Sequence, residues 1–186
     1  MNRTTKLLLV ALALCMTPVL SASGQDLKEM DRQTYLLAGQ QIFKNPPGDC
    51  SACHGWNGTG RAHDHIYAVD FDAGGPSLSL SKMTRDEMIH MVSCGSVASN
   101  GVNVMPQYRP DAWTPAYPCW GKLAADIPAD QRPLRTGWNL THAQIEAVVD
   151  YIQDAYQGKL MNWDWCSTYF DDFKRMCEVW RDYGAQ

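Results

Sequence analysis

The sequence predicts a mainly α-helical fold, and three observations carry the prediction. Apolar side chains recur at helical spacing over residues 30–44, from residue 84 onward, and over residues 141–156. Residues that start or stop helices bound these segments. No stretch sustains a period-two alternation of apolar and polar residues, which argues against an extensive sheet.

The first 24 residues have the features of an export signal. A short positive start with Arg3 and Lys6 precedes an apolar run, Leu7–Leu20, which is followed by small residues. The run is shorter than the roughly 20 residues that a bilayer-spanning helix needs. We therefore interpret residues 1–24 as a cleaved signal peptide and expect the rest of the chain in the periplasm. A lipid anchor at Cys15 is the alternative, which the bulky residue before it disfavours.

The remaining chain has the size of one domain and an acidic balance. The full chain has 16 basic and 20 acidic residues, and removal of the leader takes away Arg3 and Lys6, which leaves a net charge of −6. This balance disfavours nucleic acid and anionic membranes and suits a partner with a positive docking face. With no internal repeat present, we expect one domain over residues 25–160 and an extension over residues 161–186.

The first predicted helix leads directly into the most informative motif. It spans residues 30–44 and ends at Asn45-Pro46-Pro47. Its apolar side chains are Leu36, Leu37, Ile42 and Phe43. The motif behind it therefore begins just after a helix end.

Residues Cys50-Ser51-Ala52-Cys53-His54 form a C-x-x-C-H motif, which in an exported protein is the attachment sequence for a c-type haem. Two thiols one helical turn apart can each add to a vinyl group of one porphyrin, and His54 then lies under the iron. A thioredoxin-like motif would need a βαβ surround, and a zinc site would need a second ligand pair. Neither accompanies the motif, so we assign Cys50 and Cys53 to one covalent haem and His54 to its iron.

Two further helices have clear start signals. Thr84 can cap the first, and two acidic residues follow at the positive end of its dipole. Thr141 and Gln144 form a capping-box pattern at the second, which runs to about Tyr156, where Gly158 can end it. These helices complete the predicted helical core.

The remaining segments are a proline-rich loop and an aromatic tail. Residues 109–140 contain five prolines, too many for regular structure, so we expect a long ordered loop. Residues 161–186 are rich in aromatic side chains, namely Trp163, Trp165, Tyr169, Phe170, Phe173 and Trp180. Such aromatics usually pack against the body of a protein, and an exposed docking face is the alternative.

For the sixth iron ligand we favour Met105, which precedes Pro106 in a loop that a glycine opens and a proline stiffens. The other methionines fit packing roles more easily, since Met88 and Met91 lie on a helix stripe. Met30, Met161 and Met176 lie near segment ends. The remaining histidines are His63 and His65 in a polar stretch, which we interpret as solvated, His142 at the surface, and His90, which we expect to face outward and for which the sequence suggests no partner.

Four cysteines are left, an even number in an oxidising compartment, so disulfides are expected: Cys94, Cys119, Cys166 and Cys177. Three connectivities are possible, and the sequence alone does not choose among them. We favour Cys94 with Cys119, because this bond would close a loop around Met105 and stabilise it by roughly 3.5 kcal/mol. We favour Cys166 with Cys177 to close the tail; one straight helix would hold these two cysteines too far apart, so a turn must separate them.

With these elements in place, the chain resembles the class I cytochromes c over most of residues 30–157. Gly39 and Phe43 precede the haem motif as in the first helix of that family. Tyr151 falls where the last helix of the family presents an aromatic residue to the first. The resemblance implies a class I cytochrome c fold around one haem, with a Pro-rich loop insertion and a disulfide-stapled C-terminal extension.

The same resemblance extends to the iron environment. Gly75-Pro76-Ser77-Leu78 looks like the proline loop of the family, and Met105-Pro106 matches its distal methionine. The resemblance implies that the carbonyl of Pro76 accepts a hydrogen bond from Nδ1 of His54, which fixes the ring and raises its basicity. Axial ligation by His54 and Met105 is thus the expectation.

A looser resemblance concerns the four extra cysteines. The combination of Cys94-Gly95, Met105-Pro106 and Cys119-Trp120-Gly121 looks like the four-cysteine monohaem cytochromes of methanol metabolism that serve pyrroloquinoline-quinone (PQQ) alcohol dehydrogenases. It implies a quinoprotein dehydrogenase as the electron donor and a terminal oxidase or another cytochrome as the acceptor.

These observations predict an electron-transfer protein and not an enzyme: a soluble, monomeric periplasmic carrier of single electrons. A permanent haem subunit of a larger periplasmic oxidoreductase is one alternative, with the tail and the proline-rich loop as its interface. A haem enzyme or sensor with an open distal site is another, in which Met105 would not bind the iron.

Overall fold

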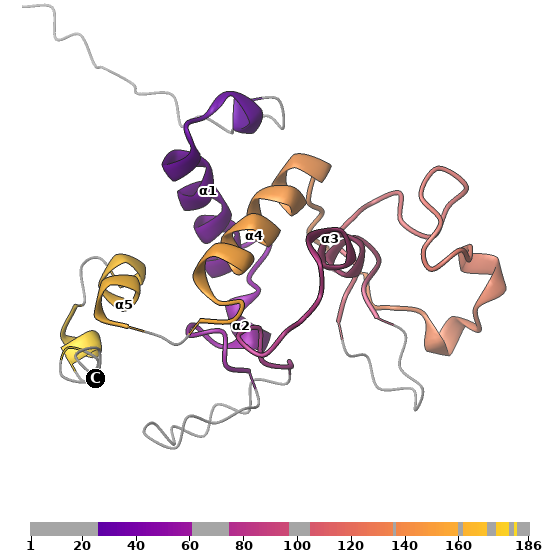
Figure 1. The fold of residues 1–186 in the computed structure, drawn as a ribbon. Coiled ribbons are helices and arrows are strands. Elements are labelled where there is room, and N and C mark those ends of the chain that lie inside the picture. The colour runs from indigo at the N-terminus through magenta and orange to yellow at the C-terminus, as the bar shows by residue number, and fades with distance from the viewer. Residues whose placement is uncertain are drawn as a thin grey trace, which may run out of the picture.

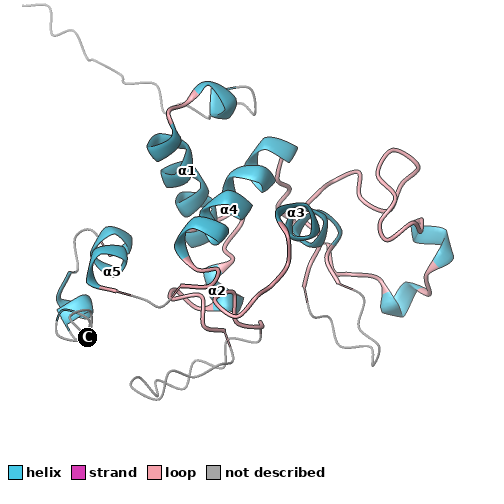
Figure 2. Cartoon of the chain, viewed as in Figure 1, coloured by secondary structure: helices cyan, strands magenta, loops and turns pink. Residues whose placement is uncertain are grey.

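The structure is a computed structural model of the 186-residue chain, and it describes residues 26–60, 75–96, 105–135, 137–159, 162–170, 174–178 and 181. The helices are α1 (Arg32–Lys44), α2 (Ser51–His54), α3 (Arg85–Cys94), α4 (His142–Ala155) and α5 (Trp163–Tyr169), as labelled in Figure 1. Short 3₁₀ turns lie at Asp26–Glu29, Ala124–Asp126, Ala129–Gln131 and Lys174–Cys177. Within the described residues β-pairing is confined to isolated bridges, and Figure 2 shows helices joined by loops. The prediction of a mainly helical fold is confirmed.

Side-chain caps start the helices near the predicted positions. The hydroxyl of Thr84 accepts from the backbone N–H of Glu87, and the Glu87 carboxylate accepts from the backbone N–H of Thr84. Thr141 and Gln144 form the same reciprocal pair at α4. Both predicted caps are therefore present. A further cap, not among those predicted, is Asp31, whose carboxylate starts α1 by accepting from two backbone N–H groups.

The core is centred where α1 crosses α4 (Figure 1). A Cβ atom on Gly39 would lie 2.2 Å from the carbonyl oxygen of Ala147, so only glycine allows the two backbones to approach this closely. Beside the crossing, the Phe43 ring packs against Tyr151 and Tyr156, with ring centroids 5.8 and 5.1 Å away. The aromatic contact expected between the first and last helices of the domain is present.

The proline-rich segment forms a second, smaller core on the outer side of α3 (Figure 1). Its buried apolar residues are Cys94, Ala112, Trp113, Cys119 and Ile127. The indole N–H of Trp113 donates to the carbonyl oxygen of Cys94 at 2.9 Å. The segment is thus fastened to the last turn of α3.

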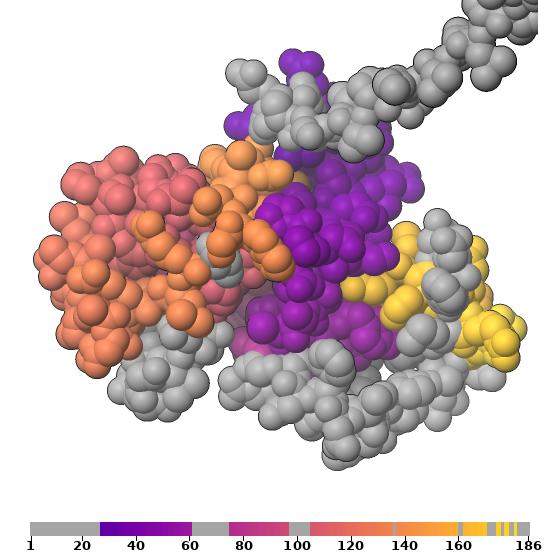
Figure 3. Space-filling view, turned by 180° about the vertical axis from the view of Figure 1, so that it is seen from behind, coloured from indigo at the N-terminus to yellow at the C-terminus, as the bar shows by residue number. Residues whose placement is uncertain are grey.

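The C-terminal extension packs against the other end of the molecule. In Figure 3 it lies beside the N-terminal helix, and the proline-rich segment lies at the opposite side. Tyr169 is buried, and the Lys44 ammonium on α1 donates to its backbone carbonyl at 2.6 Å. Trp165 stacks on Tyr169 with a centroid distance of 5.1 Å. No helix among the described residues has the length and apolarity that a bilayer span requires.

Candidate haem-binding site

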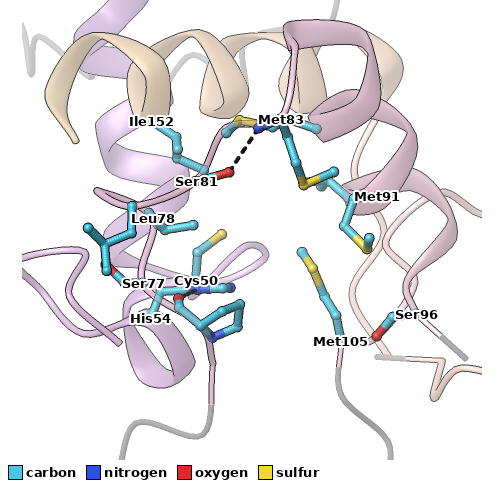
Figure 4. A pocket seen from close by; sticks show the side chains of 14 residues that line it. Cys50, His54, Ser77, Leu78, Ser81, Met83, Met91, Ser96, Met105 and Ile152 are labelled. Carbon is cyan, nitrogen blue, oxygen red and sulfur yellow. Dashed lines mark hydrogen bonds between the residues drawn. The ribbon is translucent and has the colours of Figure 1, made fainter. Parts of the chain in front are cut away.

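A cavity of about 580 Å³ opens among α2, α3 and the segment that begins at Met105, within the size range of small-molecule and cofactor pockets. Most of its lining is apolar, as Figure 4 shows. The lining residues are Cys50, His54, Pro76, Ser77, Leu78, Leu80, Ser81, Met83, Met88, Met91, Val92, Ser96, Met105 and Ile152. The cavity therefore joins the C-x-x-C-H motif, the proline loop and the predicted distal methionine in one place.

The motif forms the short helix α2, which places its two thiols differently. Cys50 is buried and lines the cavity, whereas Cys53 is exposed, and neither forms a disulfide. Burial raises the pKa of the Cys50 thiol to about 12, so this group stays protonated in a chain without haem. The two sulfurs are thus free for the thioether bonds that the motif predicts.

His54 ends α2 and is held in one orientation. Its Nδ1–H donates to the carbonyl oxygen of Pro76 at 2.9 Å, the contact that the resemblance implied. Because a carbonyl only accepts, Nδ1 carries the proton and Nε2 keeps its lone pair. Burial lowers the pKa of the imidazole and outweighs the opposite effect of the Pro76 carbonyl, which favours the neutral ring. A neutral, buried imidazole with a free Nε2 is the form that binds iron.

Two glycines allow the chain to close around this imidazole. A Cβ atom on Gly75 would lie 2.8 Å from the carbonyl oxygen of Cys53 and 2.9 Å from Nδ1 of His54. Gly60 has φ of +57°, and a Cβ there would lie 2.5 Å from the carbonyl oxygen of Gly75. The absence of side chains at both positions lets the Pro76 carbonyl reach the ring.

Met105 lies across the cavity from Cys50 and His54 (Figure 4). Its backbone carbonyl accepts from the N–H of Ser96 at 3.0 Å, in an isolated bridge between the end of α3 and the Met105 segment. The glycine that precedes this segment in the sequence, at position 101, lies outside the described residues. An imidazole and a thioether thus face one apolar cavity from opposite sides.

Three more methionines line the same cavity: Met83, Met88 and Met91. Met88 and Met91 belong to the apolar stripe predicted for this helix, and Met88 is buried in the core. The structure adds that this stripe of α3 is also a wall of the cavity, which Figure 4 shows for Met91, and Met83 lines the cavity from the segment just before α3. Polarizable thioethers suit such a wall, because they adapt to a large flat ring.

The structure joins Cys94 to Cys119 and Cys166 to Cys177, the pairing favoured from the sequence. His90 is half-buried and has partners that the sequence did not suggest. Its Nε2 lies 3.7 Å from Sγ of Cys94 and accepts the backbone N–H of Trp120 at 3.1 Å. Because Trp120 lies 30 residues from His90, no local sequence pattern indicates this contact. His90 and the sulfurs of Cys94 and Cys119 are close enough to hold a metal ion. The disulfide between the two cysteines, however, removes both sulfurs as thiolate ligands.

The other residues considered as ligands stay apart from the cavity. Met30 packs against the main core, and His142 is exposed beside Glu146 and Arg109. The predictions for His63, His65 and Met161, the signal peptide over residues 1–24 and the side chain of Met176 lie outside what the structure describes.

The geometry fits a haem on several independent counts. The cavity is apolar and has a suitable volume, the unpaired Cys50 lies in its wall with the unpaired Cys53 one helical turn further along the chain, and the imidazole presents Nε2. These features define a small helical domain built to hold a flat apolar cofactor between an imidazole and a thioether.

The cytochrome c family model matches residues 36–155, more than half of the chain, and the protein belongs to this family. Membership implies that the chain binds haem c and transfers electrons. No curated protein and no solved structure matches the chain.

Proposed function

We propose that the protein is a soluble periplasmic monohaem carrier that takes single electrons from a PQQ-dependent alcohol dehydrogenase of the methanol type and passes them to the respiratory chain. The observation that carries the carrier role is the cavity with His54 on one side and Met105 on the other. A site with both axial positions filled by the protein leaves no room for a substrate on the iron. Electron transfer without chemistry at the metal is what such a site supports best.

The chain's own residues would do the following work. Haem, when bound, supplies a metal centre that gains and loses one electron. Cys50 and Cys53 would hold it covalently, and His54 and Met105 would bind the iron. The Pro76 carbonyl fixes the His54 ring at Nδ1, so the same nitrogen faces the iron in both oxidation states. A thioether in place of a second imidazole raises the reduction potential.

The dehydrogenase partner rests on the four extra cysteines and on the Trp120-Gly121 turn, which resemble those of cytochromes from methanol metabolism. The two bonded pairs are consistent with export to an oxidising compartment. We expect a quinoprotein alcohol dehydrogenase plus methanol to reduce the protein, with the haem band as the readout. A dehydrogenase that turns over with artificial acceptors but leaves this protein oxidised would refute the assignment.

The ligand assignment is tested by the optical spectrum of the matured, oxidised holoprotein. We expect a weak band near the infrared edge, which reports iron bonded to thioether sulfur, and its loss in Met105→Ala. Met91→Ala is the matched control, because Met91 lines the same cavity and should leave the band in place. If wild type lacks the band, a haem enzyme or sensor with an open distal site replaces the carrier.

A permanent subunit of a larger oxidoreductase is the second candidate, because three large apolar side chains of the proline-rich region are exposed. They are Trp120 at 46%, Leu134 at 58% and Trp138 at 47%. Exposed apolar groups of this kind favour a lasting interface. Size-exclusion chromatography of the native periplasmic extract decides between the two, since a carrier migrates alone and a subunit migrates with its complex.

A further inference from the structure

The segment that carries Met105 is fixed on both sides by backbone hydrogen bonds. Toward α3, Ser96 donates to Met105, Tyr108 to Val92 and Arg109 to Ser93, at N···O distances of 3.0, 3.2 and 3.2 Å. Toward the proline-rich region, Gln107 donates to Leu134 and Leu140 donates to Tyr108, each at 2.9 Å. These bonds set the path of the backbone relative to α3, but they do not reach the opposite wall of the cavity.

The side chain of Tyr108 reaches the loop that precedes Cys50. Its hydroxyl donates to the carbonyl oxygen of Gly48 at 2.8 Å, and the residue is buried. Burial raises the pKa of Tyr108 well above its usual value, with a smaller contribution from Cys50, so the hydroxyl stays a donor at physiological pH. Tyr108 follows Met105 by three residues, and Gly48 precedes Cys50 by two. One hydrogen bond therefore joins the segment of the distal methionine to the segment of the haem cysteines.

Gly48 is a firm acceptor. Its own N–H donates to the carbonyl oxygen of Asn45 at 3.1 Å, and the next residue, Asp49, donates to Ile42 at 3.1 Å. A Cβ atom on Gly48 would lie 2.2 Å from the Ile42 carbonyl oxygen, so this loop is pressed against the end of α1. Because the Gly48 loop is held in place by its own contacts, the hydrogen bond to Gly48 restrains the position of Tyr108.

We propose that Tyr108 is a positioning residue that sets the separation of the two ligand-bearing segments and thereby holds Met105 on the iron against competing ligands. This inference rests on the proposed ligation by Met105. Without the hydroxyl, the Met105 segment keeps its bonds to α3 but loses its direct link to the loop before Cys50. The thioether then gives way more readily to another ligand.

The test compares Tyr108→Phe with Tyr156→Phe in the oxidised holoprotein. Tyr156 is a matched control, because it is also buried and its hydroxyl donates to a backbone carbonyl, that of Trp56, at 2.9 Å. It does not contact the Met105 segment through this bond. Each variant is titrated with imidazole at pH 7, and the loss of the thioether–iron band gives its imidazole affinity. Urea unfolding of each variant measures its global stability.

We expect Tyr108→Phe to bind imidazole about fivefold more tightly than wild type, the effect of one lost hydrogen bond. Tyr156→Phe should stay within about twofold of wild type even though it loses a comparable hydrogen bond. The pH at which the band disappears should fall by about 0.7 unit in Tyr108→Phe alone.

Equal imidazole affinities in the two variants would overturn the role of Tyr108 while leaving the carrier function intact. Absence of the band in wild type would overturn both. Should Tyr108→Phe give no holoprotein, Tyr108→His retains a ring donor. Maturation of the histidine variant alone supports the hydrogen bond, whereas failure of both, with Tyr156→Phe maturing normally, would overturn the positioning role, because restoring a donor would then not restore the site.

Discussion

Gly75 lies where any side chain would meet the imidazole of His54. Its N–H donates to the carbonyl oxygen of Cys53 at 2.8 Å, and its missing Cβ leaves space for the His54 ring and for the Pro76 carbonyl. The hydrogen bond that orients His54 therefore depends on a residue that contributes no side chain.

We expect Gly75→Ala to lower the free energy of unfolding by about 1–3 kcal/mol, because the added methyl group must displace the ring or the Cys53 carbonyl. Urea unfolding of the holoprotein measures the change. Gly137→Ala is the control, since nothing lies within 4 Å of its added Cβ, and it should be neutral or stabilise by up to about 1 kcal/mol. Equal stabilities in the two variants would contradict the close packing at Gly75.

At this scale, the sequence reveals residues that belong to a contiguous motif and misses those whose partners are distant. Cys50, Cys53 and His54 follow from one spacing, and Pro76 follows from a family pattern. Tyr108 gives no such signal, because its partner Gly48 lies 60 residues away and accepts through its backbone. The partner of His90 gives no signal for the same reason, because the backbone N–H of Trp120 lies 30 residues away.

At the scale of the helices, a partly buried cluster of polar side chains, Arg85, Tyr35 and Asp150, links α3 and α1 to α4. The Arg85 guanidinium donates twice to Asp150, from Nε to Oδ1 at 2.5 Å and from Nη2 to Oδ2 at 2.9 Å. The Tyr35 hydroxyl also donates to Oδ2 of Asp150, at 2.8 Å. Burial acts to raise the pKa of Asp150, but the hydrogen bonds from Arg85 and Tyr35 outweigh it and hold that pKa below its usual value of 3.8. One carboxylate thus serves three helices.

A carboxyl with a depressed pKa stabilises the fold above its unfolded pKa, and this contribution is lost as the pH falls through the folded pKa. We expect Asp150→Asn to cost about 2 kcal/mol at pH 7. The difference from wild type should shrink as the pH falls below 3.8, where wild-type Asp150 also becomes neutral. Urea unfolding across pH 3 to 7 measures both effects.

Asp154→Asn provides the comparison, because its ion pair with Arg32 at 3.3 Å is exposed. Its cost should stay below about 1 kcal/mol. A difference between wild type and Asp150→Asn that did not narrow at low pH would mean that the asparagine acts through packing and not through lost charge.

The helices themselves were within reach of the sequence, because spacing and caps are local. Thr84 and Thr141 start α3 and α4 as predicted, and most apolar side chains of both helices are buried. How the proline-rich region meets α3 was not predictable, since Trp113 bonds to the carbonyl of Cys94 across 19 residues of irregular chain. Such contacts depend on the final shape of a loop, which local preferences leave open.

At the scale of the whole molecule, two regions that each contain a disulfide flank the cytochrome c domain: the proline-rich region and the C-terminal extension. The bond between Cys94 and Cys119 fastens the proline-rich region behind Met105, and the bond between Cys166 and Cys177 closes the extension beyond α5. Trp56, two residues after His54, contacts the ring of Phe170 at a centroid distance of 4.7 Å. The extension therefore packs directly on the turn that follows the haem motif.

This contact makes the extension part of the cooperative unit. The ring centroid of Trp165 lies 5.1 Å from those of both Tyr156 on the domain and Tyr169 within the extension.

We expect Trp165→Ala to lower the free energy of unfolding by about 2–3 kcal/mol, somewhat less than for a fully buried tryptophan. Trp163→Ala is the matched control, because its ring meets Arg181, and it should cost less than about 1 kcal/mol. Urea unfolding followed by haem absorbance and by tryptophan fluorescence should give coincident transitions in both variants, because one unit unfolds. A separate, earlier fluorescence transition with an unchanged haem transition would make the extension an independent module instead.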